Sequence, residues 1–299
     1  MMDAPLPPSG INNPAPEAQE LQSTWEVVTN AFRYVLGKAR LITIPQEMVS
    51  SKVTHKDEDF SLTCECWWSP IDTSIYMRKC AVSEGAVNIL RDEKEILRAA
   101  QGPNIVPLIE SGDDSILMPH AGQTLYYKLE QQDEGMSHPD FRVYGSQLIN
   151  GLTHLHNSRI WHLDLKPANV LIDEEGRLSI IDFGLAQYVG PAENAEVCTE
   201  GYKPPEMFYR GKKEVSKKTD VFSAGVILFE MLTNERLFPE ALDTQTMEKQ
   251  HLYYEYLNNR LKAVDRIDSG YARLLKSMLA WNPRHRPTAS QVLGDFMRF

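Results

Sequence analysis

The sequence has few cysteines, no long apolar run and no recognisable leader, and each of these absences excludes a class of protein. Four cysteines among 299 residues are too few for a disulfide scaffold. The first residues lack a basic segment followed by an apolar core, so we expect no secretory signal. Because no apolar run approaches the length of a bilayer crossing, we expect an intracellular protein, cytoplasmic or nuclear, with no membrane span.

Positive charge is also scarce. The chain has 31 Lys and Arg residues against 41 Asp and Glu residues, which gives a formal net charge of −10. Proteins that bind nucleic acid normally present a basic face, so nucleic acid is not an expected partner. The only basic cluster is RGKKEVSKK at 210–218. Two interpretations of it stay open: a surface that attracts acidic substrates, and a solvated loop.

The composition changes along the chain and indicates three segments. Residues 1–20 are rich in Pro, Ala, Asn and Gly, which is typical of a disordered tail. Residues 21–48 form an extension of unknown role. From residue 49 onward the sequence carries first strand-like alternation with one helical pattern, and then long helical patterns. This order indicates a small sheet-rich part followed by a larger helical part.

The spacing of apolar residues predicts the individual elements. Strands are expected at 61–68, 73–80, 104–111 and 115–120. Helices are expected at 84–101, 139–157, 217–233, 249–262 and 270–280. The predicted fold class is therefore α+β.

One stretch, WHLDLKPANVLID at 161–173, combines a His-x-Asp with a Lys two residues after the Asp and an Asn three residues after the Lys. Other pieces surround it in order: YMRK, RDEKEILRAAQGPNIVPL, IIDFGLAQ, TEGYKPPEM, KKTDVFSAGVILFEMLT and WNPRHRPTASQVL. In order and spacing these pieces resemble the eukaryotic-type protein kinases over roughly residues 49–299. The resemblance implies a bilobal protein-kinase fold, with a small β-rich N-lobe at 49–119 that holds one main helix, and a larger, mainly helical C-lobe at 122–299.

The resemblance also implies a role for each polar residue of the motifs. Asp164 would accept the hydrogen bond of the substrate hydroxyl and act as the base, and Lys166 would hold the transferred phosphate. Asn169 and Asp182 would hold Mg²⁺, since amide and carboxylate oxygens suit a hard cation. The implied reaction is phosphate transfer from ATP to a protein substrate.

Lys79 would contact the inner phosphates of ATP, and Glu93 would orient it through an ion pair. Taken alone, this Lys and this Glu could equally be two solvated surface charges. The other four groups, present in the expected order, favour the functional interpretation.

The predicted hinge between the lobes reads ILMPHAG, residues 116–122. By the resemblance, Met118 takes the gatekeeper place and Pro119 the first hinge position. Pro119 lacks an N–H but keeps its carbonyl, and Ala121 offers both groups, so the hinge permits adenine binding. Leu171 would lie under the adenine.

Other matches are expected to be structural. Glu206 and Arg286 would form a buried ion pair beneath the activation segment. His162 would be a packed imidazole beside Phe183, with Asp220 as the anchor of this region, rather than a base or a metal ligand.

The sequence departs from the family where a glycine-rich loop should cover the phosphates. No glycine occurs between Gly37 and Gly85, and the stretch around residues 55–63 reads HKDEDFSLT. Glycine lets a backbone approach phosphate closely, whereas Asp57, Glu58 and Asp59 would repel it if they face it. Together with Met77, which stands where the family has a small Ala, this departure supports the alternative of a pseudokinase scaffold that binds partners with weak or no phosphotransfer.

A second departure is Leu163, which replaces the Arg that usually receives a phosphate on the activation segment. Its loss removes a switch and leaves the catalytic groups in place, so we expect activity that does not depend on phosphorylation of that segment. Thr199 is expected to bridge Asp164 and Lys166, with a phosphorylation site as the alternative. Since Asp-x-Lys-x-x-Asn resembles the motif of the serine/threonine kinases, we expect Ser or Thr residues of a protein substrate as acceptors. A regulatory protein partner is a further possibility that the sequence leaves open.

Overall fold

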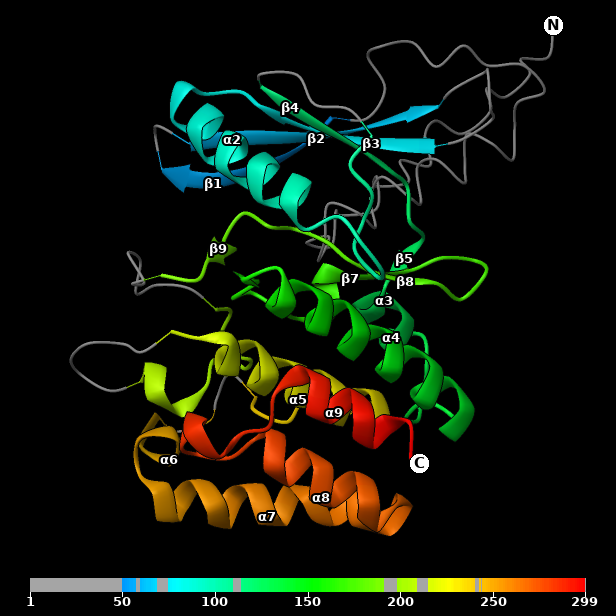
Figure 1. The fold of residues 1–299 in the computed structure, drawn as a ribbon, viewed down its shortest axis with the longest axis vertical. Coiled ribbons are helices and arrows are strands. Elements are labelled where there is room, and N and C mark those ends of the chain that lie inside the picture. The colour runs from blue at the N-terminus through cyan, green and yellow to red at the C-terminus, as the bar shows by residue number, and fades with distance from the viewer. Residues whose placement is uncertain are drawn as a thin grey trace, which may run out of the picture.

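The computed structural model describes residues 50–57, 60–68, 75–109, 114–190, 198–208, 215–239, 242 and 244–298. The predicted tail at 1–20 and the extension at 21–48 lie outside these residues. The elements form a small lobe and a larger one (Figure 1). The small lobe consists of β1 (Ser50–Asp57), β2 (Phe60–Trp68), β3 (Ile75–Ala81), α2 (Glu84–Ala99) and β4 (Ser115–Pro119).

The small lobe is an antiparallel sheet with the strand order β1-β2-β3-β4, and α2 lies across one of its faces (Figure 1). The helix begins after Ser83, whose hydroxyl accepts a hydrogen bond from the amide of Ala86. Leu90, Glu93 and Leu97 recur at helical spacing and are buried. Because Glu93 lies on this buried stripe, the helix turns a carboxylate toward the interior of the lobe.

The larger lobe is mainly helical, with short strands where it meets the small lobe. Its strands are β5 (Gln123–Thr124), β6 (Ile160–Trp161), β7 (Val170–Ile172), β8 (Leu178–Ile180) and β9 (Gln187–Tyr188). Its helices are α3 (Leu125–Glu130), α4 (His138–Asn157), α5 (Lys217–Thr233), α6 (Thr244–Glu248), α7 (Gln250–Ile267), α8 (Ser269–Met278) and α9 (Ala289–Phe296). Short 3₁₀ turns lie at η1 (Pro167–Asn169), η2 (Pro205–Met207) and η3 (Pro283–His285). The small strand-containing lobe and the helical larger lobe confirm the predicted fold class.

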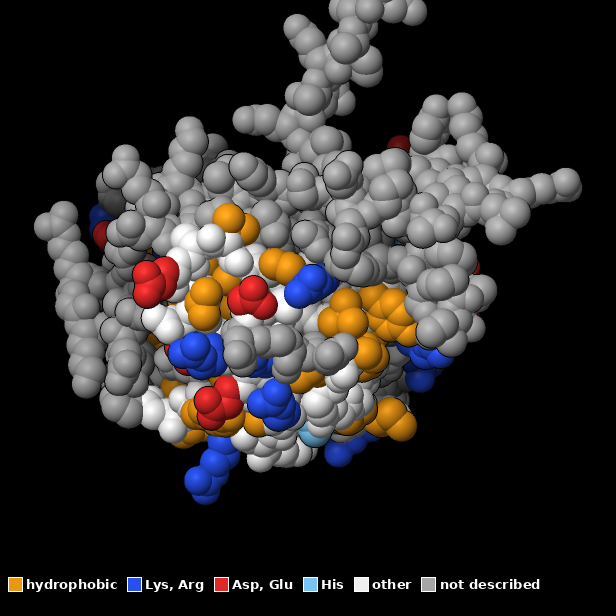
Figure 2. Space-filling view, turned by 90° about the horizontal axis from the view of Figure 1, so that it is seen from above, with side chains coloured by type: hydrophobic (Ala, Val, Ile, Leu, Met, Phe, Trp, Pro, Cys, Tyr) orange, Lys and Arg blue, Asp and Glu red, His pale blue; other side chains and the backbone are white. Residues whose placement is uncertain are grey.

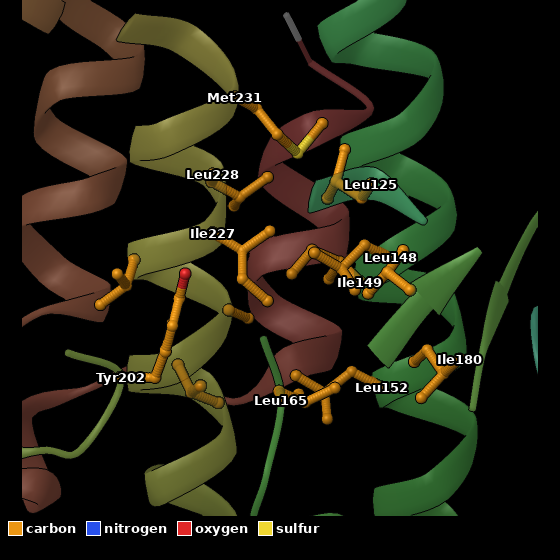
Figure 3. Close-up of a cluster of buried hydrophobic side chains, with 14 of the residues drawn as sticks. Leu125, Leu148, Ile149, Leu152, Leu165, Ile180, Tyr202, Ile227, Leu228 and Met231 are labelled. Atoms are coloured by element: carbon orange, nitrogen blue, oxygen red, sulfur yellow. The ribbon is translucent and has the colours of Figure 1, made fainter. Parts of the chain in front are cut away.

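The core of the larger lobe holds the loops that carry the polar motifs. Figure 3 shows Leu148 and Leu152 from α4 on the side that faces α5, with Leu165 beside Leu152 and with Tyr202 on the far side of Ile227. Leu165 is fully buried and lies between the polar residues 164 and 166. The core therefore fixes the backbone of the motif loop while the neighbouring polar side chains point elsewhere.

The strand predicted at 104–111 is wrong for the residues that the structure describes there. Only Ile105 forms a bridge, to Ile180 of β8, and the amide of Ile109 donates to the carbonyl of Leu117. Pro107 lies between these contacts and has no N–H to donate, which interrupts a regular ladder. The apolar run IVPLI at 105–109 is present in the sequence, but Pro107 within it cannot donate a hydrogen bond to a neighbouring strand.

Charge on the small lobe is mixed. Where described residues are visible from above, Lys and Arg side chains lie among Asp and Glu side chains and hydrophobic ones (Figure 2). None of the helices in the described part of the chain combines the length and the apolar composition that a bilayer crossing needs.

Candidate active site

Lys79, Glu93 and Asp182 meet between the two lobes. The Lys79 ammonium lies 3.0 and 2.8 Å from the two carboxylate oxygens of Glu93 and 3.1 Å from an oxygen of Asp182. The antiparallel pairing of β2, β3 and β4 fixes Lys79 in the middle of the sheet, opposite Cys64 and Ile116. Glu93, 14 residues from Lys79 in the sequence, and Asp182, 103 residues from it, thus meet the same ammonium. The ion pair between Lys79 and Glu93 is the one that the resemblance implied.

The two carboxyl groups of this cluster titrate differently. The Lys79 ammonium lowers the pKa of Asp182 to about 2 against the effect of burial. Burial raises the pKa of Glu93, and Lys79 opposes that rise. Asp182, with a side chain that is 42% exposed, is the carboxylate of the pair that remains open to a ligand.

Asp164 and Lys166 meet on the motif loop, and Thr199 joins them. The Thr199 amide and hydroxyl donate to Asp164 Oδ1 at 2.9 and 2.7 Å, and Lys166 Nζ donates to the Thr199 hydroxyl at 2.8 Å. Lys166 Nζ also lies 2.8 Å from Asp164 Oδ2. The expected bridge through Thr199 is confirmed, and its hydroxyl is fully engaged in it.

Asn169 and Asp182 supply oxygens of the kind that Mg²⁺ prefers. Asn169 Nδ2 donates to the main-chain oxygen and to Oδ2 of Asp164, at 2.8 and 3.2 Å, which commits its nitrogen and leaves its side-chain oxygen for another partner. No group of three or more His, Cys, Asp or Glu side chains suited to a metal occurs in the described part of the chain. A Mg²⁺ ion here would therefore rely on these two residues and on phosphate oxygens, which is how that ion is commonly held.

A buried histidine connects the loop to the helical core. His162 Nε2 lies 3.0 Å from the Ile181 carbonyl, and its ring centroid lies 5.2 Å from that of Phe183. Asp220 accepts from the amides of His162 and Leu163 at 3.0 and 2.7 Å. The Asp164 amide donates to Nδ1 of His162 at 3.3 Å. Both nitrogens and the ring of His162 thus have structural partners, which agrees with the expected role of a packed imidazole.

The predicted hinge residues lie at the edge between the lobes. Met118 and Pro119 end β4 and lie opposite Met77 and Tyr76 of β3, and Ala121 follows two residues later. Leu171 is buried on β7, whose neighbour in the sheet is β5, the first strand after the hinge. The pairing of β5 with β7 thus places Leu171 opposite Thr124, just after the hinge, although the two residues are far apart in the sequence.

The glycine-free stretch forms a hairpin. β1 and β2 pair antiparallel, with Asp57 opposite Phe60 at the closed end. Glu58 and Asp59 lie between them, outside the described residues, so the direction of the acidic side chains stays a prediction. Arg210, Lys212 and Lys213 of the basic cluster also lie outside the described residues.

An apolar cluster surrounds the position of the missing arginine, and sequence reasoning did not find it. Leu163 is buried with Trp161 of β6, Met207 of η2 and Val215, and the partly buried Cys198 lies against them. Leu163 has a left-handed backbone, with φ of 66°, a conformation that costs free energy for a residue other than glycine. The Leu in place of the expected Arg was a sign in the sequence that this position is unusual. The residues that pack against Leu163 could not be identified from the sequence, because their segments carry no periodic apolar pattern.

Two further anchors hold the segment that ends the activation region. The Tyr202 hydroxyl donates to Glu230 of α5 at 2.8 Å, and burial raises the pKa of Glu230 to about 7. Arg286 forms two hydrogen bonds with Glu206, at 2.7 and 2.6 Å, and the expected buried ion pair is confirmed. Tyr202 and Glu230 were not predicted, although a single Glu inside the apolar run GVILFEML indicates a buried partner.

Several known protein kinases are similar to this chain in sequence. The chain is 31% identical to the carbon catabolite-derepressing protein kinase of Saccharomyces cerevisiae over 214 residues, which are 69% of this chain and 32% of the relative. It is 30% identical to sperm motility kinase 2B of Mus musculus over 223 residues, 71% of this chain and 43% of that protein. A probable cyclin-dependent serine/threonine-protein kinase of Dictyostelium discoideum is 31% identical over 58% of this chain and 13% of its own length.

The chain spans less than half of the length of these curated relatives. The matched family covers most of the chain itself: residues 74–296 match the family described as the protein kinase domain. That range begins just before β3, which carries Lys79, and ends at the last residue of α9. This chain belongs to the protein kinase domain family.

Proposed function

We propose that the chain is a serine/threonine protein kinase that transfers the γ-phosphate of ATP to protein hydroxyls. The observation that carries the proposal is the ionic cluster in which Lys79 contacts both Glu93 and Asp182. It joins the small lobe to the motif loops of the larger lobe with the charges that a bound triphosphate and its cation require. The names of the relatives support the same class of reaction.

On the acceptor side, Asp164 would bind the substrate hydroxyl and take its proton. Its side chain is nearly buried, at 7% exposed, and its orientation is fixed by Thr199 and Asn169. Lys166, which is held by the same Thr199, would stabilise negative charge on the phosphate as it moves. Little covalent assistance is required, because positioning and charge stabilisation supply most of the catalysis of phosphate transfer.

On the nucleotide side, Lys79 would bind the inner phosphates, and Asn169 and Asp182 would hold Mg²⁺. The ion, when bound, would neutralise phosphate charge. Met118, Pro119, Ala121 and Leu171 would line the adenine site. Glu93 would keep Lys79 in place when the nucleotide leaves.

The second candidate function is a scaffold that binds protein partners and transfers little phosphate. The observation that favours it is the pairing of the glycine-free strands β1 and β2 with Asp57 opposite Phe60 at one end, together with the acidic sequence of residues 57–59. The cluster of Lys79, Glu93 and Asp182 favours the enzyme, because a scaffold does not require these buried charges.

A binding and transfer experiment separates the two candidates. The melting temperature is measured with and without ATP and Mg²⁺, and transfer of radiolabelled phosphate is then measured on a mixed library of Ser, Thr and Tyr peptides. The proposal expects stabilisation by the nucleotide and label on Ser and Thr peptides. Label on Tyr peptides alone would contradict the substrate class, and nucleotide binding without transfer would favour the scaffold.

We also propose that activity does not depend on phosphorylation of the activation segment. Leu163 offers apolar contacts with Trp161, Met207 and Cys198 instead of a cation for a phosphate. The Thr199 hydroxyl is already committed to Asp164 and Lys166. These contacts attach the end of the segment to the motif loop without a modification.

Phosphatase treatment is therefore expected to change the transfer rate little. The measurement compares purified protein before and after treatment, with complete removal of phosphate verified by mass spectrometry. A kinase that carries an Arg at the position of Leu163 serves as the positive control for loss of activity. Loss of most of the activity, followed by recovery when Thr199 is rephosphorylated, would show that the proposal is wrong.

The acidic hairpin is expected to weaken ATP binding. Each carboxylate several ångströms from the triphosphate costs on the order of 1 kcal/mol near a surface and less in salt. Changing Asp57, Glu58 and Asp59 to Asn, Gln and Asn should therefore tighten ATP binding about tenfold or more at low salt, since 1.4 kcal/mol is one decade.

Adenosine is the matched ligand for this triple variant, because it lacks the phosphates. Its affinity, measured by calorimetry in the same buffer, should stay close to that of the unchanged protein. An equal gain for both ligands would indicate a packing effect, and no gain for either would mean that the acidic side chains point away from the site.

A further inference from the structure

Lys203 is fixed close to the proposed base by anchors on both sides. Four residues earlier, Thr199 is bonded to Asp164, and a tight turn follows, in which the Tyr202 amide donates to the Thr199 carbonyl at 3.1 Å. Tyr202 is buried in the core of the larger lobe (Figure 3). On the other side, Pro205 begins a 3₁₀ turn whose Glu206 is bound to Arg286. The backbone at Lys203 therefore has little freedom to move away from the acceptor side of the site.

The side chain of Lys203 is mostly buried, but the carboxylate beside it neutralises its positive charge only weakly. Its side chain is 18% exposed, close to the 16% of Lys79. Lys79 has carboxylate oxygens at 2.8 and 3.1 Å. The nearest carboxylate to Lys203 in the described part of the chain belongs to Glu200, at 4.0 Å, and that side chain is 75% exposed. An exposed carboxylate at that distance contributes little, because water and salt screen it.

The other contact of the Lys203 ammonium is an aromatic face. It lies 5.7 Å from the centroid of the Phe208 ring, which stabilises a cation without cancelling its charge. The result is a positive group, held in place beside the site and still able to bind an anion. Lys166, by contrast, is committed to Asp164 and Thr199.

We propose that Lys203 selects substrates with an acidic residue directly adjacent to the Ser or Thr that accepts the phosphate. This inference rests on the proposed kinase function. We place the neighbouring residue of the bound peptide along the segment from Thr199 to Lys203, because Thr199 is bonded to Asp164, which would hold the substrate hydroxyl. A carboxylate there would give Lys203 the close partner that it lacks, and Glu200 would compete with it.

The test uses three peptides that share one acceptor Ser and differ only in an Asp at the preceding position, an Asp at the following position, or neither. The ratio of kcat/KM for the better acidic peptide to that for the neutral peptide should be roughly three- to tenfold at low salt, and it should fall as salt is added. Lys203→Gln should bring this ratio to about one, and Lys203→Arg should preserve it. Glu200→Gln should increase it.

Lys262→Gln is the matched control, because it removes the same charge from an exposed position of α7 at the far end of the larger lobe (Figure 1). It should leave the ratio unchanged. A ratio near one in the unchanged protein, or a ratio that Lys203→Gln does not alter, overturns the inference.

Peptide binding, measured by fluorescence anisotropy with the same three peptides, separates this inference from the proposed function. If no peptide is phosphorylated but the acidic peptide binds more tightly in a manner that depends on Lys203, the kinase function fails and the acidic preference stands. If transfer proceeds equally on all three peptides and binding is also equal, the kinase function stands and Lys203 has no such role.

Discussion

Asp164→Asn is expected to lower kcat for phosphate transfer by about two to four orders of magnitude, the usual contribution of a general base. Asn has almost the same shape as Asp, so its side-chain oxygen can still accept from the Thr199 amide and hydroxyl. It cannot take a proton, and it removes the ion pair with Lys166. The expected result is therefore a folded protein that binds ATP and does not transfer its phosphate.

Three measurements define this result: kcat by radiolabel, ATP affinity by calorimetry and the melting temperature. Asp173→Asn is the matched control, because Asp173 follows β7 and is paired with the exposed Arg177 outside the site. It should leave kcat close to that of the unchanged protein. Activity near that level in the Asp164→Asn variant would remove Asp164 as the base.

Glu206→Ala is expected to reduce the free energy of unfolding by about 3–5 kcal/mol, because it leaves a buried charge without its partner. Arg286 is among the largest fully buried side chains of the protein, and both of its terminal nitrogens bond to Glu206. Carbonyls of the chain accept its other hydrogen bonds, including that of Ala280 at 2.8 Å. They cannot neutralise the guanidinium. Denaturant unfolding measures the loss.

Two further variants show whether the buried charge causes this loss. The double variant Glu206→Met with Arg286→Met should recover part of the stability, since apolar side chains can replace a buried ion pair at little cost. Asp295→Asn breaks an ion pair with Arg298, whose side chain is 80% exposed, and should cost less than about 1 kcal/mol. If Glu206→Ala costs no more than Asp295→Asn, the pair does not stabilise the fold in the way proposed.

The ionic contacts were predictable through the resemblance to the protein kinases. The resemblance paired Lys79 with Glu93 and Arg286 with Glu206, whereas Lys79 and Glu93 taken alone could have been two solvated surface charges. Helices with a clear apolar stripe, such as α2 and α8, were predictable because their buried residues recur at helical spacing.

Apolar contacts between loops were not predictable in this way. Trp161 and Leu163 lie on one loop, whereas Met207 and Val215 come from two later segments, and other large apolar residues could have filled the same space. Their sequence carries no period, so nothing in it states that they touch. The bond between Tyr202 and Glu230 was missed for a related reason: the acid was visible in its apolar run, but several hydroxyls could have served as its donor.

The cluster around Leu163 has a consequence for how quickly such an enzyme could be controlled. A phosphate can be added and removed many times in the life of a protein, whereas apolar contacts persist for as long as the chain stays folded. If the segment is attached in this way, the output of the enzyme follows its abundance. If synthesis and degradation of the chain set its activity, that activity would change as slowly as the protein is turned over. If a partner that blocks the site sets it, the activity would change as fast as that partner binds and dissociates.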